Sequence, residues 1–474
     1  MKRNKDLRDF LAGIKERGSD FYVEVKKPLE PELEVCVIQQ KLAKAGRYPV
    51  IYCPEIKDSK LPLITNVFGS YEMLGLALGI APEEQDKSKV LHEFRKRVAN
   101  KIPIQFIPAK EAPVKEIVLT GKDADLGLLP ITRHALLDSG KYVTIGCMIC
   151  KDPDTGTPNV GIYRHEVKGK DELGCMVNPA HHASYIARRY AELGKPTEVV
   201  LFVGHHPAVI LGADIRGDMD DDEMEIMGGL LGEPLLVTKG ETVDVPVPAW
   251  AEVAIEGVID PTKMVTDGPF AEYSGYYGEG EKPSFLIKVT SITMRKDAIY
   301  HDLDPAHREH NFSSGLPFES NAYDIIKKIV PSLKAVHFPP SGTCILHMYV
   351  SIKKRIAGEG KMAGLAAVAS DLSVKLVIVV DEDIDIYNEE EVLWAVATRV
   401  VGDKDISIIP SVAGAHLDPS AYDETRLKSG NMTSNVIIDA TKPVEMPFAT
   451  RITPPPDLWK SMRLEDYIFD PRER

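Results

Sequence analysis

Two acidic residues flank a Gly-Pro turn in residues 266–277, which read TDGPFAEYSGYY. Asp267 precedes the turn and Glu272 follows it, in a run that is otherwise small, aromatic and apolar. Two interpretations are open. Either the segment is a surface loop with solvated acids, or the two carboxylates face one site. The segment alone does not decide between them, so the rest of the chain must.

A basic residue in segment 158–167, PNVGIYRHEV, is a candidate partner for these acids. On a β-strand, Arg164 faces the side opposite to its neighbour Tyr163. If that side is inward, Arg164 needs acidic partners, because an unpaired buried guanidinium is very costly. Asp267 and Glu272 would meet that need. From the strand alone, an ordinary surface arginine is the simpler interpretation.

Two histidines and an acidic run have the residue types of a metal or phosphate site. His181 and His182 stand at the start of a helix expected over 180–194, and a helix N-terminus favours anions such as phosphate. These histidines either bind a metal, contact phosphate or cap the helix. Of the six acids in 218–225, Glu223 stands nearest an apolar segment and is the best candidate to point inward. Asparagine, histidine and glutamate ligands suit a hard divalent cation.

The bulk composition excludes two classes of partner. The 474 residues carry a net charge of −14, which argues against a nucleic-acid binder, because phosphate backbones require a basic face. No run approaches the roughly 20 apolar residues of a membrane span. The charged start, MKRNKDLRDFLAGIKERG, lacks the apolar core of a signal peptide. A cytoplasmic location, with neither nucleic acid nor membrane as a partner, is the expectation.

Six cysteines are scattered along the chain and do not form a disulfide framework. Cys147 and Cys150 form a CxxC, but the surrounding VTIGCMIC is expected to be a strand, where residues three apart point to opposite faces. There is no second CxxC. Buried thiols are therefore favoured over a zinc or redox site.

The periodicity of the chain predicts a multidomain protein of the α+β and α/β classes. Residues 1–115 predict a small α/β domain. Residues 116–300 alternate short apolar runs with turn signals and predict an antiparallel β-barrel. Residues 301–325 are expected to be a linker, and residues 326–440 alternate helices and strands, which implies an α/β domain with a parallel-type sheet. The Pro-rich tail, 441–474, ends in an amphipathic piece that is a candidate for the oligomer interface.

Several motifs occur in one order along the chain: N-x-G-x-Y-R, H-H, E-x(4)-G-x-L-x-G-E-P, V-P-x-x-A-E-x-x-x-E-G, D-G-P-F-A-E-Y-x-G-Y-Y, K-x-V-I-V-V-D-E-D-I-D and E-V-x-W-A-x-x-T-R. Together they resemble the UbiD family of prenylated-FMN-dependent (de)carboxylases over residues 115–415. The resemblance implies a split β-barrel of the flavin-reductase type that binds prenylated FMN. It also implies reversible, non-oxidative decarboxylation.

The resemblance assigns metal ligands. Asn159, His182 and Glu223 match the family's ligands to a divalent metal, Mn²⁺ or Mg²⁺, which grips the cofactor phosphate, with K⁺ close by. His181 stands near the phosphate, where the family often has glutamine.

The resemblance also assigns residues around the flavin and the substrate. Ile162 and Arg164 match positions beside the flavin ring, and Lys375 matches a lysine linked to cofactor binding. Arg164, Asp267 and Glu272 resemble an acid–arginine–acid network, with Arg164 holding the substrate carboxylate and Glu272 donating the proton. Many family members have glutamate where this chain has Asp267, so the part played by Asp267 is the least defined.

The substrate is the least determined feature. The segment YHDLDPAHREHNFSSGLP holds four basic residues that are either part of a solvated loop or the wall of a polar substrate pocket: His301, His307, Arg308 and His310. The pocket interpretation favours an aromatic or heteroaromatic acid with a polar substituent, such as a furan dicarboxylate or a hydroxybenzoate. An unsaturated aliphatic acid is an alternative.

Two rival functions remain open, an FMN-dependent oxidoreductase on a split barrel and a non-catalytic protein that retains the fold. The family resemblance further implies a small carboxylic acid as substrate, a flavin prenyltransferase as source of the cofactor, and a homo-oligomer, either a dimer or a hexamer.

Overall fold

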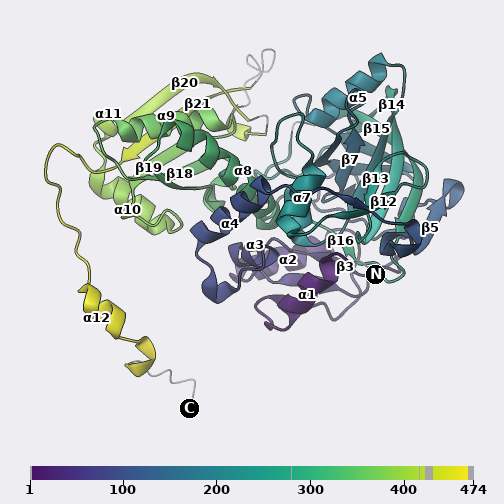
Figure 1. The fold of residues 1–474 in the computed structure, drawn as a ribbon, viewed down its shortest axis with the longest axis horizontal. Helices are drawn as coiled ribbons and strands as arrows, with labels where there is room; N and C mark the ends of the chain where they lie inside the picture. Colours follow the sequence, from purple (N-terminus) through teal and green to yellow (C-terminus); the bar gives the residue numbers. More distant parts are fainter. Residues whose placement is uncertain (1–2, 279, 416, 422–430, 468–474) are drawn as a thin grey trace.

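The computed structural model describes residues 3–278, 280–415, 417–421 and 431–467. Figure 1 shows a larger body, which contains the N-terminal helices and the central sheets, and a smaller body formed by the C-terminal part of the chain. A C-terminal arm extends away from the smaller body.

The N-terminal region is a four-stranded sheet with helices around it. The strand order is β1–β2–β3–β16, and the strands are β1 (Tyr22–Glu24), β2 (Val50–Cys53), β3 (Leu63–Thr65) and β16 (Tyr300–His301). The helices are α1 (Leu7–Lys15), α2 (Glu34–Lys44), α3 (Tyr71–Ala77) and α4 (Lys87–Ala99). Helix α1 begins where it does because the Asp6 side chain accepts hydrogen bonds from the backbone N–H groups of Arg8 and Asp9.

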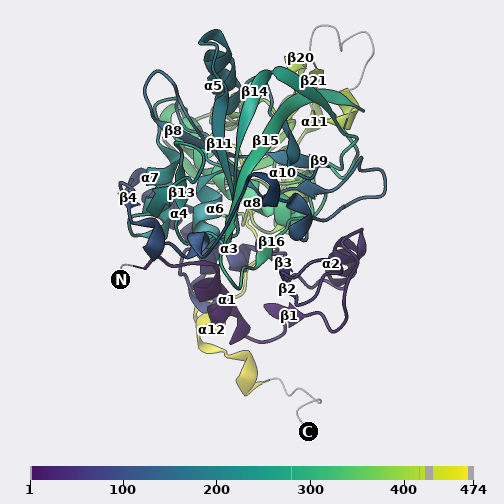
Figure 2. The same ribbon diagram turned by 90° about the vertical axis from the view of Figure 1, so that its right-hand side faces the viewer.

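The central region is an antiparallel sheet that curls into a half-barrel, as predicted. Its order is β6–β9–β10–β15–β14–β11–β7–β8, with β5 paired to β15. The strands are β5 (Ile117–Thr120), β6 (Tyr142–Val143), β7 (Cys147–Lys151), β8 (Pro158–Ile162), β9 (Arg164–Gly169), β10 (Glu172–Met176), β11 (Thr197–Val203), β14 (Val253–Asp267) and β15 (Lys282–Met294). The predicted inserted helix is α5 (His182–Glu192), which packs on β11 and β14 (Figure 2).

A smaller sheet and two helices join the half-barrel to the N-terminal helices. The sheet has the order β13–β12–β4, and the elements are β4 (Gln105–Phe106), β12 (Leu236–Lys239), β13 (Pro246–Pro248), α6 (Pro207–Gly212) and α7 (Glu223–Leu231). Glycine permits the close approach of α7 to the end of α4. A Cβ on Gly229 would lie 2.5 Å from the carbonyl oxygens of Arg97 and Asn100.

The C-terminal body is a five-stranded mixed sheet with the order β17–β18–β19–β21–β20. Strands β18, β19 and β21 are parallel, as predicted, and the two edge strands are antiparallel. The elements are α8 (Arg308–Ile329), β17 (Leu333–His337), β18 (His347–Ile352), α9 (Glu359–Ser370), β19 (Leu376–Asp381), α10 (Glu389–Arg399), α11 (Gly402–Asp405), β20 (Ile406–Ala413) and β21 (Met432–Ala440). Alternate residues of β19 pack in different apolar clusters, Val377 with residues of α9 and Ile378 with residues of α10, so these helices cover opposite faces.

The structure corrects the linker predicted for residues 301–325. His301 lies in β16, and α8 occupies the segment from Arg308 onward. Polar side chains of this segment are buried rather than solvated. The Glu309 carboxylate, for example, accepts hydrogen bonds at 2.7 and 2.6 Å from the backbone N–H groups of Asn66 and Val67.

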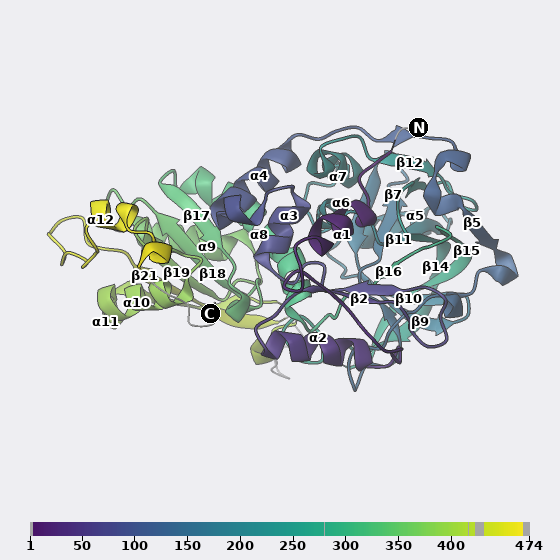
Figure 3. The same ribbon diagram turned by 90° about the horizontal axis from the view of Figure 1, so that it is seen from below.

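The tail forms an arm with one short α-helix, α12 (Pro456–Ser461), which lies away from both bodies in Figure 1 and overlaps the smaller body in the view from below in Figure 3. Among the described residues, no helix is long and apolar enough to cross a membrane. All six cysteines are free and buried, in agreement with the expectation of buried thiols.

Candidate active site

Arg164 lies between the two acids that flank the Gly-Pro turn. Its Nε and Nη2 donate to Asp267 Oδ2 at 2.9 and 2.5 Å, and its Nη1 donates to Glu272 Oε1. Both acids are buried, with Asp267 0% and Glu272 6% exposed. We call these three residues the Arg164 cluster.

A break between two strands places Arg164 there. The sequence suggested one continuous strand, but β8 ends at Ile162 and β9 begins at Arg164. Tyr163 packs in the apolar cluster inside the half-barrel, so Arg164 points to the other side. There its guanidinium carbon lies 4.8 Å from the centre of the Phe270 ring.

The two acids come from one hairpin connection. Asp267 is the last residue of β14, and Glu272 follows the turn that leads toward β15. The Glu272 N–H donates to the Tyr276 carbonyl at 2.9 Å, and the Gly275 N–H donates back to the Glu272 carbonyl at 2.9 Å. The backbone on either side of Glu272 is therefore held in a tight, closed loop, 268–278.

Burial gives the cluster its acid–base character. It raises the pKa of Glu272 to about 7, although Arg164 opposes the shift. It also raises the pKa of Asp267, again against the effect of Arg164. Asp267 Oδ1 is buried without a hydrogen-bond partner. One cation thus serves two buried acids, and a carboxyl that titrates near neutral pH both donates and accepts a proton there.

A second pair of polar side chains lies at the start of α7. The Asn159 Nδ2 donates to Glu223 Oε1 at 2.9 Å, and the Val160 N–H donates to Glu223 Oε2 at 3.1 Å. Burial raises the pKa of Glu223 to about 7, and Asn159 Oδ1 is buried without a partner. A buried carboxylate beside an unsatisfied amide oxygen is a donor set that fits a hard divalent cation.

The two histidines lie at the N-terminus of α5. His181 is the N-cap residue and His182 is the first residue of the helix. The His181 ring lies 5.8 Å from the ring of Tyr163, and burial together with Arg216 lowers the pKa of His181. Helix α5 packs against β8, the strand that carries Asn159. The structure therefore places His182 on an element that adjoins Asn159, without a direct hydrogen bond between the two side chains.

Lys375 and Ile162 lie on different bodies. Ile162 is the half-buried last residue of β8, and Lys375 directly precedes β19 in the C-terminal body. The Lys375 ammonium pairs with Asp418 Oδ2 at 2.8 Å. Burial, Glu272 and Asp418 together raise the pKa of Tyr273, the residue after Glu272, so Asp418 lies close enough to act on the Glu272 loop.

The four basic residues around the start of α8 do not share one environment. His301 is buried against Phe68, and His307 caps α8, with its Nδ1 accepting from the Glu309 N–H at 3.3 Å. Arg308 and His310 are half-buried. The His310 ring lies 6.4 Å from the ring of Tyr273. The segment is thus not a solvated loop.

The Arg308 guanidinium lies between two aromatic rings. Its central carbon is 4.4 Å from the centre of the Tyr48 ring and 4.6 Å from that of Phe312. Its Nε is buried without a hydrogen-bond partner, and no carboxylate among the described residues pairs with it. Arg308 is therefore fixed between the two rings, and its guanidinium N–H groups are available to a further acceptor.

Arg216 is a cation that acts on the pKa of His181 and that the sequence did not single out. It pairs with Asp371 of the C-terminal body, and its guanidinium lies 4.2 Å from the centre of the Phe318 ring. The only signal in the sequence was a basic residue just before the acidic run 218–225. The acids of that run offered Arg216 local partners, whereas its actual partner, Asp371, is far away in the chain.

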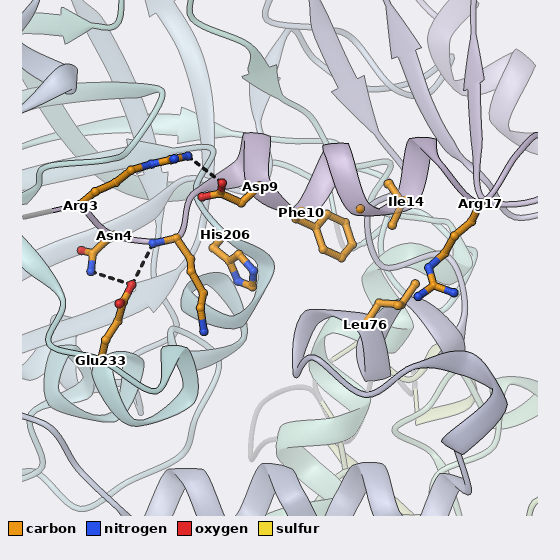
Figure 4. Close-up of a pocket in the computed structure, with 11 residues that line it drawn as sticks. Arg3, Asn4, Asp9, Phe10, Ile14, Arg17, Leu76, His206 and Glu233 are labelled. Carbon is orange, nitrogen blue, oxygen red and sulfur yellow. Dashed lines mark hydrogen bonds and ion pairs between the residues drawn. The ribbon is translucent and has the colours of Figure 1, made fainter.

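A groove of about 490 Å³ lies beside α1, away from these residues (Figure 4). Its lining includes Phe10, Ile14, Leu76 and Glu233. Glu233 lies beyond the C-terminal end of α7, whereas Glu223 is its first residue, and nine residues of helix span about 13 Å. None of the site residues described above lines the groove.

Comparison with known families matches almost the whole chain. Three models of 3-octaprenyl-4-hydroxybenzoate carboxy-lyase match: its N-terminal domain matches residues 17–97, its Rift-related domain residues 106–307 and its C-terminal domain residues 293–440.

Individual relatives match most of the length of the chain. An anhydromevalonate phosphate decarboxylase from Methanothermobacter thermautotrophicus is 35% identical over 92% of this chain and 97% of its own. A phenolic acid decarboxylase from Sedimentibacter hydroxybenzoicus is 30% identical over 96% of this chain and 95% of its own. The UbiD-class enzyme HmfF from Pelotomaculum thermopropionicum, solved in complex with FMN, has a TM-score of 0.90 at 35% identity and covers 98% of this chain and 100% of its own. An evolved dimeric form of HmfF was solved in complex with prFMN, with a TM-score of 0.85 at 33% identity over 98% of this chain and 100% of its own.

Proposed function

The chain belongs to the UbiD family of carboxy-lyases, and on that premise we propose that it reversibly decarboxylates an unsaturated or aromatic acid that carries a second anionic group. The relatives support a range of acids, since one is named for anhydromevalonate phosphate and another for phenolic acids. The observation that carries the proposal is the Arg164 cluster, in which one guanidinium serves two buried carboxylates.

Arg164 and Glu272 divide the work of the reaction. A guanidinium has five N–H donors, and the cluster uses three of them. Two remain for the substrate carboxylate. The bond from that carboxylate to the substrate carbon breaks, carbon dioxide leaves, and the electron pair stays on the carbon. The carboxyl proton of Glu272 is then transferred to that carbon, and in the carboxylation direction Glu272 takes it back.

The cofactor of the proposal is prenylated FMN, held through its phosphate by a divalent cation. Asn159, His182 and Glu223 would bind the cation, which is Mn²⁺ or Mg²⁺. The unsatisfied Asn159 Oδ1 and the raised pKa of Glu223 fit this assignment. The chemistry supplied by the bound cofactor is stabilisation of negative charge on the carbon that loses the carboxylate. A flavin prenyltransferase in the same cell would supply it.

Arg308 is proposed to bind the second anionic group of the substrate. It is held between Tyr48 and Phe312 without an acidic partner, which suits a carboxylate or a phosphate. The His310 ring, two residues after Arg308, lies 6.4 Å from the ring of Tyr273 and so brings the start of α8 to the Glu272 loop. His301 and His307 remain candidates for substrate contact, since both ring nitrogens of His301 and Nε2 of His307 are buried without hydrogen-bond partners.

The direct test is carbon dioxide release by protein purified from cells that also express a flavin prenyltransferase. The acids would be furan-2,5-dicarboxylate, 4-hydroxybenzoate and a phosphate-bearing α,β-unsaturated acid, with furan-2-carboxylate as the acid that lacks a second anionic group. We expect release from at least one acid with a second anionic group. If flavin-loaded protein releases carbon dioxide from none of them but oxidises NADH, an oxidoreductase is the better description.

The contribution of Arg308 is tested by Arg308→Ala, with Arg355→Ala as a matched control. Arg355 is an exposed arginine that pairs with Glu359 in the C-terminal body. A charge-assisted hydrogen bond contributes about 2 kcal/mol, so the KM for the accepted acid should rise about 30-fold in Arg308→Ala. Turnover of furan-2-carboxylate should not change. An equal loss with both acids would contradict the assignment.

A second copy of the chain is proposed to cover the C-terminal arm. Apolar side chains on the arm are exposed, including Ile452 at 97% and Trp459 at 74%. Beyond Arg451, which pairs with Glu391, the arm lies off the body of its own chain (Figure 1). Truncation after Lys442 should therefore convert the homo-oligomer to a smaller species in analytical ultracentrifugation, and an unchanged mass would refute the assignment.

A further inference from the structure

The loop that carries Glu272 has a second attachment, distinct from Arg164. The segment 134–142, which precedes and enters β6, runs alongside loop 268–278. The Ser139 N–H donates to the Pro269 carbonyl at 2.9 Å, and the Leu137 N–H donates to Tyr277 Oη at 2.9 Å.

Asp138 is the only carboxylate among these contacts. Its Oδ1 accepts from the Ala271 N–H at 2.9 Å, and Ala271 is the residue directly before Glu272. Its Oδ2 accepts from the Ala135 N–H at 2.8 Å, which closes a turn in its own segment. The residue is 2% exposed. One buried carboxylate therefore accepts from the backbone of both segments, in addition to the Ser139–Pro269 and Leu137–Tyr277 hydrogen bonds between them.

A buried histidine, His134, lies close to Asp138 in the same segment. His134 Nε2 lies 2.9 Å from Asp302 Oδ1, and Thr132 Oγ1 donates to Asp302 Oδ2 at 2.8 Å. Asp302, Asp304 and Asp138 all raise the pKa of His134. Burial raises the pKa of Asp138, and the hydrogen bonds from the Ala271 and Ala135 N–H groups, together with His134, oppose that rise.

A carboxylate is not needed merely to satisfy the Ala271 N–H, since any carbonyl oxygen would do so. A carboxylate accepts hydrogen bonds in two directions with roughly twice the strength of a neutral acceptor. Asp138 thus fixes the position of Ala271 relative to Ala135. The Glu272 side chain is fixed independently by Arg164. The two attachments together determine where the carboxyl of Glu272 lies.

We propose that Asp138 is a positioning residue for Glu272, holding the backbone of the Glu272 loop so that the carboxyl stays buried against Arg164. This inference rests on the proposed role of Glu272 as proton donor. It makes Asp138, with His134 behind it, a determinant of both the rate and the pH range of the reaction.

Loosening the loop is expected to lower the pKa of Glu272. Burial keeps Glu272 protonated near neutral pH against the effects of Arg164 and Lys282, while Asp267 acts with burial. Tyr273 of the same loop and Asp418 of the C-terminal body face it as well. If the loop opens, water reaches the carboxyl and its pKa falls toward the ordinary value. The fraction of Glu272 that is protonated at pH 7 then decreases.

The test uses Asp138→Ala and Asp138→Asn in the full-length, cofactor-loaded protein. Asp138→Ala removes both acceptors, and we expect kcat to fall about 100-fold, the loss typical of a misplacement of about 1 Å. We also expect the alkaline limb of the pH–kcat profile to move to lower pH. Asp138→Asn keeps a carbonyl oxygen for the Ala271 N–H but places an amide against the Ala135 N–H, so about a 10-fold loss is expected.

Asp125→Ala is the matched control. Asp125 also accepts from a backbone N–H, that of Gly127 at 2.9 Å, but it has no contact with the Glu272 loop. Its removal should leave both kcat and the pH profile unchanged. A lower yield of folded protein in the Asp138 variants reduces activity equally at every pH, so a shift of the limb separates positioning from stability.

Hydrogen–deuterium exchange gives a readout that does not depend on turnover. The amides of peptide 268–278 should exchange at least tenfold faster in Asp138→Ala than in the wild type, and at the wild-type rate in Asp125→Ala. An unchanged exchange rate together with an unmoved pH limb would overturn the inference. If the wild type releases no carbon dioxide from any acid, the proposed function fails, while the exchange data still decide whether Asp138 holds the loop.

Discussion

Two buried clusters of arginine and acid differ in a way that separates chemistry from architecture. One is the Arg164 cluster. The other, which we call the Arg8 cluster, attaches α1 to the half-barrel and consists of Arg8, Arg295, Asp6 and Glu252. Arg8 holds Glu252 with two hydrogen bonds of 3.1 and 3.0 Å, and Arg295 donates to Asp6 at 2.8 Å. In the Arg8 cluster, two guanidiniums serve two buried acids, whereas in the Arg164 cluster one guanidinium serves two.

The two clusters also differ in how many of their carboxylate oxygens have a hydrogen-bond partner. In the Arg8 cluster, Asp6 Oδ1 accepts from the N–H groups that begin α1, and Glu252 Oε2 also accepts from the Ile299 N–H at 2.9 Å. Every carboxylate oxygen there has a partner. In the Arg164 cluster, Asp267 Oδ1 has none. Burial raises the pKa of Glu252 as well as that of Glu272, so the direction of a pKa shift alone does not identify a catalytic acid. What distinguishes the Arg164 cluster is that its two carboxylates have fewer cations and fewer hydrogen-bond donors than those of the Arg8 cluster.

The largest expected effect is that of Glu272→Gln. Loss of a general acid typically costs 10²- to 10⁴-fold, so kcat should fall about 1,000-fold because the amide has no proton to give. Melting temperature, flavin absorbance and metal content should stay at wild-type values. A variant that turns over at the wild-type rate would remove Glu272 from the mechanism and make the two clusters equivalent.

The reciprocal change is Arg8→Ala in the Arg8 cluster. It leaves Glu252 buried without its cation, and breaking a buried pair costs about 3 kcal/mol. The midpoint of denaturant unfolding should decrease accordingly, while kcat per folded molecule stays constant. A loss of kcat without a loss of stability would show that the Arg8 cluster is not purely architectural.

The smallest and most specific effect is the pH dependence of decarboxylation. With the pKa of Glu272 raised to about 7, the donor is protonated below pH 7 and ionised above it. The rate should therefore be constant on the acid side of pH 7 and fall about tenfold per unit above it. A rate that continues unchanged to pH 9 would contradict this assignment.

Much of the fold was predictable because it depends on local patterns. The DPDTG turn between two β-rich runs predicted the β7–β8 hairpin, and the apolar run at 376–380 predicted β19. Alternating helices and strands predicted the parallel centre of the C-terminal sheet. The prediction of a linker over residues 301–325 missed α8 because contacts between distant segments, not local patterns, decide the structure there. The Glu309 carboxylate of this segment is satisfied by the backbone of Asn66 and Val67, distant contacts that no local pattern reveals.

The candidate site divides in the same way. The motif order identified Asn159, Arg164, Glu223 and Glu272 as a group, and the structure pairs Asn159 with Glu223 and Arg164 with Glu272. It did not distinguish Arg308 from His301 and His307, because all three are basic residues in one short segment. Only packing shows that the two histidines are buried while Arg308 lacks an acid. Asp138 gave no signal, since an aspartate in a loop looks the same whether or not it holds another loop.

By itself the sequence determined the order of the strands and helices, the chemical groups available and the family to which they belong, since these follow from residue types and their spacing along the chain. Only the tertiary structure decided which acids share a cation and which are fully paired. Arg164 and Glu272 are 108 residues apart, and the proton affinity of a carboxyl depends on the water, charges and donors that surround it in space. Those surroundings exist only once the half-barrel, the hairpin loop and the segment of Asp138 have packed together.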